Sequence, residues 1–301
     1  MIMRRNTLGG ILAILLWSTT IAFSRGLIAS IGVFSAGAFC FLTAGLLGLL
    51  WSRMRKNSPA HPLSLPPSYL LSCGAVFVAY QLCLYLAVGL APGGAQVVEV
   101  GIINYLWPVL TLVLSIPMLR TRARLWVIPG FLLALAGTVL AVTNPFADAT
   151  LSPASTPAVV PILALVAAVT WALYSNFARR HAGSHQGDAV PLFFLASGSL
   201  MLALRSVFAE HSQWSTQAVL TLCYMALCPN LIAYTLWDKA MRRGDIVLVT
   251  VLSYFTPLLS TAVTCVCLKV WPGWNVWAAC GLLIAGALLS RWSLKAPEQQ
   301  A

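Results

Sequence analysis

The sequence predicts an all-α polytopic membrane protein that crosses the bilayer ten times and consists of two inverted five-helix repeats. Three observations support this prediction: the apolar composition, the number of long apolar segments and the placement of basic residues between them. Of the 301 residues, 59% are apolar and only 8% are charged, whereas a soluble domain carries roughly a quarter charged residues. Apolar runs of about 20 residues recur, which is the length that a helix needs to cross roughly 30 Å of hydrocarbon.

Ten apolar segments follow one another along the chain, separated by turn formers and charges. The longest interruption, around residues 144–157, divides them into two groups of five. We therefore expect a first repeat over 1–147, a periplasmic linker over 148–157 and a second repeat over 158–301. The first segment follows Arg4 and Arg5 like a signal peptide, but its counterpart in the middle of the chain indicates a retained helix. The segments are 7–24, 32–52, 68–90, 94–118, 124–143, 158–178, 189–208, 216–239, 245–268 and 273–292.

Ten crossings assign each loop to one of the two sides of the membrane, and most basic residues fall on one of these sides. The 18 Lys and Arg residues outnumber seven Asp and Glu residues, which gives a net charge of +11. No basic-aromatic patch or phosphate-binding glycine loop points to nucleic acid. Apart from Arg25, Arg205 and Lys269, the basic residues within and between the segments fall on the side of the two termini. Lys and Arg mark the cytoplasmic side, so both termini are predicted to be cytoplasmic.

The two groups of segments share a sparse pattern. WSTTIAFSR at 17–25 and WALYSNFAR at 171–179 have the same Trp, Phe and Arg spacing. Further along, an offset of 149 aligns APGGAQVVEVGIINYLWP at 91–108 with AMRRGDIVLVTVLSYFTP at 240–257. Five crossings are an odd number, so the second repeat enters the membrane in the opposite sense. Inverted repeats of this kind enclose a midplane cavity that opens alternately to the two sides.

Pro108 and Pro257 occupy equivalent positions inside apolar segments. Each proline lacks an N–H and clashes with the carbonyl four residues earlier, so both positions are predicted helix kinks. The freed carbonyls must face protein or water, because they are costly in hydrocarbon. The pair of prolines therefore favours kinked helices that line a cavity. The alternative is that side chains hydrogen-bond to the freed carbonyls at the kinks.

Glu99 is the acidic residue of a run otherwise free of charge. A charge at the centre of a helix costs roughly 3 kcal/mol on insertion scales. One interpretation is a carboxylate for proton coupling or amine binding. The other is a residue near the outer interface, close to the PGG turn at 92–94, and both remain open.

Several aromatic residues lie too deep for the interfacial belts at the membrane surface. Neutral polar residues at comparable depth are Asn176, Asn230 and the possible polar handles Gln81 and Asn104. Aromatic walls with a few polar groups suit a small amphipathic or aromatic substrate better than an inorganic ion. The deep aromatic residues are Trp17, Tyr80, Tyr85, Tyr105, Trp107, Trp171, Tyr174, Tyr234 and Tyr254.

The chain resembles the EamA-type branch of the drug/metabolite transporter superfamily. The resemblance rests on the two inverted halves, the first segment LLWSTTIAFSRG and the paired motifs YLWPVL and YFTPLL. Within this branch, the chain looks like the bacterial exporters of aromatic amino acids. The motifs that carry this likeness are WSTTIAFSR, VEVGIINYLWPVL and WALYSNFARR. The resemblance implies a basket-like bundle in the bacterial inner membrane that moves amino acids outward through a central cavity. It also implies that this substrate cavity is formed by Trp17, Tyr80, Tyr105, Trp107, Trp171 and Tyr254.

The predicted function is a secondary transporter that exports amino acids, aromatic ones foremost, and related metabolites by alternating access. An exporter of other small organic compounds or lipophilic cations is the alternative. A membrane-embedded transferase is disfavoured because the deep region offers Glu99 alone for acid–base chemistry, and a scaffold or receptor has no need of inverted halves. We expect no metal and no cofactor, and all eight cysteines fall in apolar runs as packing residues. The expected partners are the amino-acid substrate and the lipid bilayer, with neither nucleic acid nor an obligatory protein partner.

Overall fold

The computed structural model describes residues 2–54, 66–120, 124–143, 156–181, 189–243, 249 and 252–293, and within these ranges the chain is helical apart from short connections. The all-α prediction is confirmed for these residues. Most of the predicted linker at 148–157 lies outside them, as do three of the basic loop residues, Arg55, Lys56 and Arg122. The helices are α1 (Ile2–Ser18), α2 (Thr20–Ile31), α3 (Val33–Met54), α4 (Pro67–Leu90), α5 (Gly94–Asn104), α6 (Trp107–Leu119), α7 (Val127–Thr143), α8 (Val159–His181), α9 (Val190–Val207), α10 (Thr216–Met225), the π-helix η3 (Ala226–Ile232), α11 (Ala233–Arg243), α13 (Thr256–Leu268) and α14 (Trp274–Ser293).

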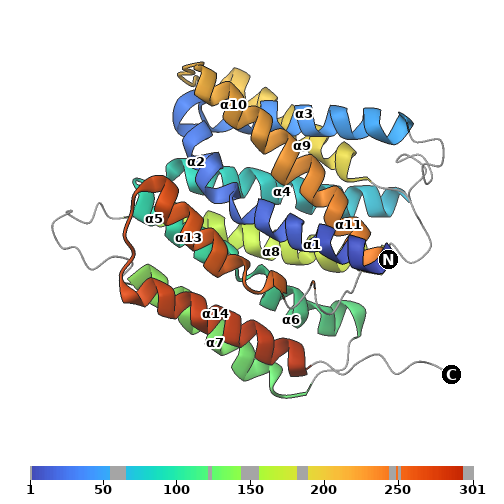
Figure 1. Cartoon of the computed structure of the whole chain (residues 1–301), viewed down its shortest axis with the longest axis vertical. Coiled ribbons are helices and arrows are strands. Elements are labelled where there is room, and N and C mark those ends of the chain that lie inside the picture. Colours follow the sequence, from blue (N-terminus) through green and yellow to red (C-terminus); the bar gives the residue numbers. More distant parts are fainter. Residues whose placement is uncertain are drawn as a thin grey trace.

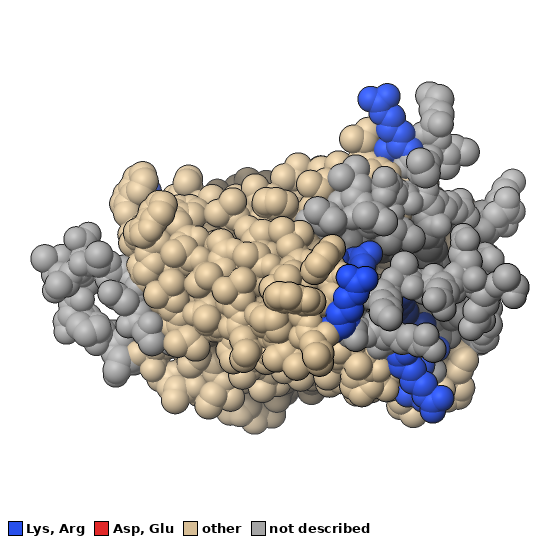
Figure 2. All heavy atoms as spheres, turned by 90° about the horizontal axis from the view of Figure 1, so that it is seen from below, with Lys and Arg blue, Asp and Glu red and all other residues tan. Residues whose placement is uncertain are grey.

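The helices form a bundle whose surface suits lipid. In the described residues, seven helical segments are long and apolar enough to cross a membrane, or eight if α1 and α2, which meet at a bend of 40°, form one span. Two shorter apolar helices accompany them. Large side chains such as Leu71 (73% exposed) and Val266 (76% exposed) point outward. Figure 2 shows one face on which Lys and Arg gather toward one end and leave a broad uncharged band.

Helices from the two halves of the sequence pack against each other throughout the bundle (Figure 1). The helix α3 packs along α9, α4 along α8, α1 along α11, and α7 along α14. Small residues allow the closest of these approaches: a Cβ atom on Gly137 of α7 would lie 2.8 Å from the carbonyl oxygen of Ala279 on α14. Lipid tails are as apolar as leucine, so close backbone packing, rather than a hydrophobic driving force, holds such helices together.

Two short turns interrupt the helical chain at equivalent positions. One separates α5 from α6, and the other directly precedes α13. At each turn Leu106 or Phe255 donates its backbone N–H to the carbonyl three residues earlier, at 3.1 Å in both cases. Pro108 and Pro257 lie in the first turn of the helix that follows, where the missing N–H would have no helical partner.

A third irregularity is the π-helix η3, which contains Pro229. Because proline has no N–H, the carbonyl of Met225 loses its usual donor, and the side-chain amide of Asn230 donates to it instead at 2.8 Å. The N–H of Ala233 bonds to the carbonyl five residues earlier rather than to Pro229. The carbonyl of Pro229 accepts a hydrogen bond from the indole Nε1 of Trp17 at 3.0 Å. This hydrogen bond joins η3 to α1.

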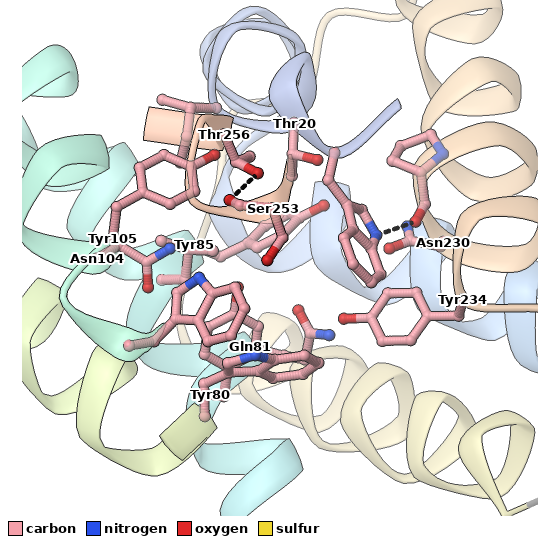
Figure 3. Close-up of a pocket in the computed structure, with 16 residues that line it drawn as sticks. Thr20, Tyr80, Gln81, Tyr85, Asn104, Tyr105, Asn230, Tyr234, Ser253 and Thr256 are labelled. Carbon is pink, nitrogen blue, oxygen red and sulfur yellow. Dashed lines mark hydrogen bonds between the residues drawn. The ribbon is translucent and has the colours of Figure 1, made fainter. Parts of the chain in front are cut away.

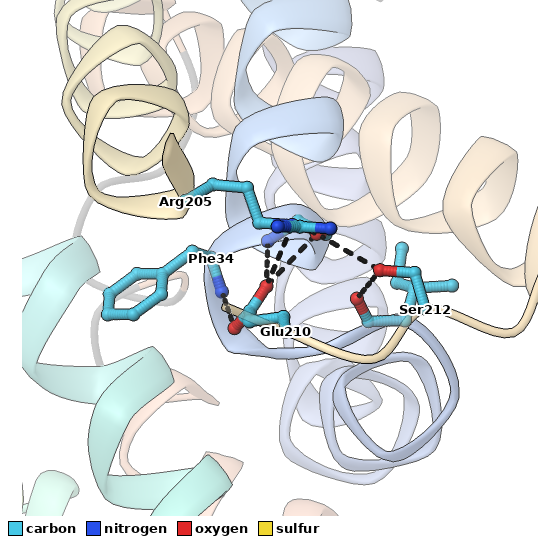
Figure 4. Close-up of polar contacts among 6 residues, drawn as sticks. Phe34, Arg205, Glu210 and Ser212 are labelled. Carbon is cyan, nitrogen blue, oxygen red and sulfur yellow. Dashed lines mark hydrogen bonds and ion pairs between the residues drawn. The ribbon is translucent and has the colours of Figure 1, made fainter. Parts of the chain in front are cut away.

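The connection between α9 and α10 caps the start of α3 (Figure 4). The carboxylate of Glu210 accepts hydrogen bonds from the backbone N–H groups of Phe34 (2.8 Å) and Ser35 (2.9 Å). The guanidinium Nε of Arg205 lies 3.6 Å from the same carboxylate. The first N–H groups of a helix have no partner within the helix and carry its positive dipole end. A carboxylate from the second half of the chain thus holds a helix of the first half.

Replacing Glu210 with alanine is expected to lower the free energy of unfolding by about 1–3 kcal/mol, because charge-assisted hydrogen bonds to the α3 terminus are lost. Glu210→Gln keeps one acceptor oxygen and should lose less. Thermal unfolding of the purified variants in detergent measures both effects. A Glu210→Ala protein that melts at the temperature of the unmodified protein would contradict this account of the cap.

Candidate functional site

A cavity of about 60 Å³ lies where the irregular parts of the chain converge. It is bounded by the α1–α2 bend, α4, the α5–α6 turn, α8, η3 and the turn before α13 (Figure 3). This volume holds a few water molecules, so a ligand as large as an amino acid requires the surrounding side chains to move apart. The lining residues are Trp17, Thr20, Ile21, Tyr80, Gln81, Leu84, Tyr85, Asn104, Tyr105, Trp107, Trp171, Pro229, Asn230, Tyr234, Ser253 and Thr256.

Trp171 is the centre of the aromatic wall of this cavity. Its ring centroid lies 4.7 Å from that of Tyr80, 5.9 Å from that of Tyr234 and 6.3 Å from that of Trp107. The ring of Trp17 also contacts that of Tyr234, with the two ring centroids 5.1 Å apart. These separations fall within the range in which aromatic rings attract one another. A flat ring that enters the cavity therefore meets aromatic faces and edges contributed by α1, α4, α6, α8 and α11.

Three polar atoms of the lining are unpaired. Thr20 Oγ1, the Tyr85 hydroxyl and Asn104 Oδ1 are buried and have no hydrogen-bond partner among the described residues. Asn104 is only 4% exposed. A buried polar atom without a partner costs about 1–3 kcal/mol. A ligand that hydrogen-bonds to these three atoms removes this cost, and the bound state is stabilised accordingly.

The described lining of the cavity carries no charged side chain. Its polar groups are hydroxyls, amides and backbone carbonyls, which can donate to a carboxylate or accept from an ammonium group. Among the described residues, no group of three or more His, Cys, Asp or Glu side chains is arranged to hold a metal ion. The site is therefore suited to binding a polar, aromatic molecule without net charge.

A sequence model of the EamA-like transporter family matches the chain over residues 6–143 and again over residues 159–292. The chain belongs to the EamA-like transporter family. It is a transporter and not the membrane-embedded transferase considered from the sequence.

This EamA-like transporter is similar to curated proteins over nearly its whole length. The aromatic amino acid exporter YddG of Escherichia coli (strain K12) is 30% identical, with 95% of this chain and 96% of that protein covered. The protein of the same name from Ancylobacter novellus is 32% identical, with 94% and 96% covered. A solved crystal structure with 30% sequence identity superposes with a TM-score of 0.69 and covers 96% of this chain and 97% of that one.

Most of the residues predicted for the substrate cavity of this EamA-like transporter lie together in the structure. Gln81 and Asn104, the predicted polar handles, also line the cavity. Tyr254 does not line it: only 3% exposed, it is part of a separate apolar cluster with Ile102 and Leu283. That any of these residues contacts substrate stays a prediction. Those that line the cavity are Trp17, Tyr80, Tyr105, Trp107 and Trp171.

Glu99 lies on α5 but does not line the cavity. It is 5% exposed, and no ion pair joins it to another described residue. Pro108 and Pro257 likewise stand beside the cavity, at the turns that bring their neighbours into it. A coupling role for Glu99 remains a prediction.

The cavity also contains residues outside the predicted set. The offset of 149 pairs Asn104 with Ser253 and Trp107 with Thr256. Applying this offset to the predicted residues would therefore have identified Ser253 and Thr256. Thr20 enters through the α1–α2 bend, which apolar periodicity does not predict. Asn230 enters through η3 and was noted from the sequence as a deep polar residue, although not as part of the predicted site. These additional polar residues are Thr20, Asn230, Ser253 and Thr256.

Proposed function

We propose that this chain exports aromatic amino acids from the cytoplasm. Its relatives from Escherichia coli and Ancylobacter novellus are named aromatic amino acid exporters and match it over at least 94% of its length. The observation that carries the proposal is the position of the Trp171-centred aromatic wall beside the unpaired amide oxygen of Asn104. One part of the cavity suits a ring, and the other suits the polar end of the same molecule.

A zwitterion fits this chemistry better than a cation. The α-ammonium group can donate to Asn104 Oδ1, and the hydroxyls of Thr20 and Tyr85 can donate to the α-carboxylate. A lipophilic cation would be attracted by the ring faces, but the described lining holds no carboxylate to neutralise it. An amino acid carries its own compensating charge, so the uncharged cavity favours it over the alternative substrate class.

The proposed topology is ten crossings in two inverted halves, 1–147 and 158–301, joined by a periplasmic linker at 148–157. The family model matches once in each half, which supports it. So do α6 and α13, which are both 13 residues long and lie 149 positions apart. Each is followed by a left-handed, non-glycine residue, Arg120 (φ 52°) or Lys269 (φ 54°). Such residues are uncommon, so their equivalence favours a common origin for the two halves.

Both termini are proposed to face the cytoplasm of a bacterium, with the bundle in the inner membrane. The start of α1 and the end of α14 lie at the same end of the bundle in Figure 1. The Lys and Arg side chains visible in Figure 2 gather toward that end. A concentration of basic residues is typical of the cytoplasmic side.

Transport is proposed to proceed by alternating access through the central cavity. The cavity receives residues from equivalent turns of both halves, since Asn104 corresponds to Ser253 and Trp107 to Thr256. Two halves related by an axis in the membrane plane can exchange conformations, so that a cavity between them opens to one side at a time.

The test is counterflow in proteoliposomes. Vesicles loaded with unlabelled tryptophan are expected to take up radiolabelled tryptophan, and external phenylalanine should compete. Lysine and glutamate should compete at least about tenfold less well, because an uncharged cavity does not compensate their net charge. Absence of counterflow with correctly folded protein would refute the proposal. Preferential competition by tetraphenylphosphonium would instead favour the export of lipophilic cations.

A further inference from the structure

A second hollow of about 160 Å³ lies along the seam between α2 and α10, next to the end of α13. Its apolar side includes Phe23 and Leu27, and its polar side includes Ser30, Gln217 and Thr221. Thr221 is 8% exposed, and no hydrogen bond joins its hydroxyl to another described residue. Like the central cavity, this hollow combines an aromatic ring with uncharged polar groups.

The two cavities follow one another along the same pair of helices. On α2, Ser30 and Gly26 of the hollow are followed, one turn at a time, by Phe23 and then by Thr20 of the central cavity. On α10, Thr221 leads in the same direction toward η3, whose residues Pro229 and Asn230 also line the central cavity. Residues three or four apart share one face of a helix. The seam is therefore a continuous face that connects the hollow with the central cavity.

The side chain of Tyr224 contacts α2 on the stretch that links the two cavities. Its ring lies 4.8 Å from that of Phe23, and its hydroxyl lies 2.8 Å from Thr19 Oγ1. Because Thr19 Oγ1 donates its own hydrogen to the carbonyl of Leu16, the tyrosine is the donor in this contact. Thr19 lies at the bend between α1 and α2, and Tyr224 lies two positions before the first residue of η3. These contacts of Tyr224 are thus made where both helices depart from regular geometry.

We propose that the hollow is a release site for the exported amino acid and that the Phe23–Tyr224 pair separates it from the central cavity. The ring of the substrate would pack on Phe23 and Leu27, while Thr221 and Gln217 would bind its polar end. The residues of α2 that line the hollow lie between Ala22 and Ser30. Figure 1 shows that this half of α2 points away from the start of α1, and it is the external half in the proposed orientation. This inference rests on the proposed export function.

Filling the hollow tests the proposal. A Cβ atom on Gly26 meets no atom within 4 Å, so Gly26→Trp places an indole in the hollow without a backbone clash. We expect tryptophan counterflow to fall by roughly tenfold or more, because a hollow of this size is then occupied. Equilibrium binding of radiolabelled tryptophan should change by less than about threefold, because the central cavity is untouched.

Gly281 provides the matched control. A Cβ atom there also meets no atom within 4 Å, and Gly281 lies on α14, away from both cavities. Gly281→Trp should therefore leave counterflow unchanged. Counterflow by Gly26→Trp at the control rate would overturn the release site and leave the export function standing. An unmodified protein that shows neither binding nor counterflow would refute the export function, and this inference with it.

A native cysteine gives a second measurement that requires no substitution. Cys267 lines the hollow and is exposed. A membrane-impermeant thiol reagent added outside should modify it, as identified by peptide mass spectrometry, and saturating tryptophan should slow the reaction severalfold. Reaction with lipid-soluble maleimides alone would mean that the hollow opens to lipid, which would overturn the proposal.

The partition is tested through Thr20→Cys, which places a thiol in the central cavity. Adding Tyr224→Ala should increase external labelling of this thiol by roughly tenfold, because the barrier is removed. Adding Tyr224→Phe retains the ring and should increase it less. Equal labelling in all three proteins would show that Tyr224 is not the partition.

Discussion

Replacing Trp171 with alanine is expected to lower the rate of tryptophan transport by roughly tenfold to a hundredfold, because removing an aromatic wall of the cavity forfeits about 1.5–3 kcal/mol of ring contacts. Trp171 contacts Tyr80, Tyr234 and Trp107 across the cavity, so its loss also leaves those rings without support. Counterflow of radiolabelled tryptophan in proteoliposomes measures the effect.

The controls for this variant separate function from folding. Trp171→Phe keeps an aromatic ring and should retain more activity than Trp171→Ala. Trp292, which is 64% exposed, lies at the end of α14 and does not line the cavity. Trp292→Ala should transport normally. A Trp171→Ala protein that is monodisperse in detergent and transports at the unmodified rate would show that the aromatic wall is not used.

Replacing Asn104 with leucine is expected to reduce tryptophan binding and transport by roughly tenfold or more, while the melting temperature stays the same or rises. The two side chains share the same branched skeleton of four non-hydrogen atoms, so leucine keeps the shape of asparagine apart from its bulkier methyl groups. The variant removes a polar atom that has no hydrogen-bond partner among the described residues, so no hydrogen bond within the protein is lost. Opposite changes in binding and stability would distinguish a ligand-binding residue from a structural one.

Asn176 supplies the matched substitution. Its amide donates to the carbonyls of Thr111 (3.0 Å) and Ala172 (2.9 Å), and it is 2% exposed but does not line the cavity. Asn176→Leu should therefore lower the melting temperature, because the Thr111 carbonyl loses a donor. If Asn104→Leu also lowers the melting temperature and leaves tryptophan affinity intact, the assignment of Asn104 to substrate binding is wrong.

The all-helical architecture could be predicted because its determinants are local. Apolar segments, loop charges and the offset of 149 are all readable without contacts, and α6 and α13 occur at that offset. The α1–α2 bend could not be predicted from the shared Trp-Phe-Arg pattern, since the matching α8 is continuous. Ser18 and Thr19 donate their hydroxyls to carbonyls three residues earlier, a competition with helical geometry that Ala172 and Leu173 of α8 cannot offer.

The cavity was predictable to the extent that its residues lie at the repeated positions. Trp17 and Trp171 both line it, as their recurrence suggested. Tyr105 and Tyr254 are also equivalent, yet only Tyr105 lines the cavity, because Tyr254 packs into the cluster against α14. The contribution of η3 depends on the contact between Trp17 and Pro229, which are 212 positions apart. Apolar periodicity carries no information about such a contact.

The uncharged lining also determines which forces can drive the transporter. A membrane potential of 100 mV acts on each transferred elementary charge with about 2.3 kcal/mol, but a zwitterion carries no net charge, and the described lining adds none. Voltage therefore acts on the zwitterion itself neither outward nor inward. If no ion is coupled to transport, the amino acid leaves only down its own concentration ratio, at about 1.4 kcal/mol for each factor of ten. A proton coupled through Glu99 would instead make transport depend on the electrical state of the membrane.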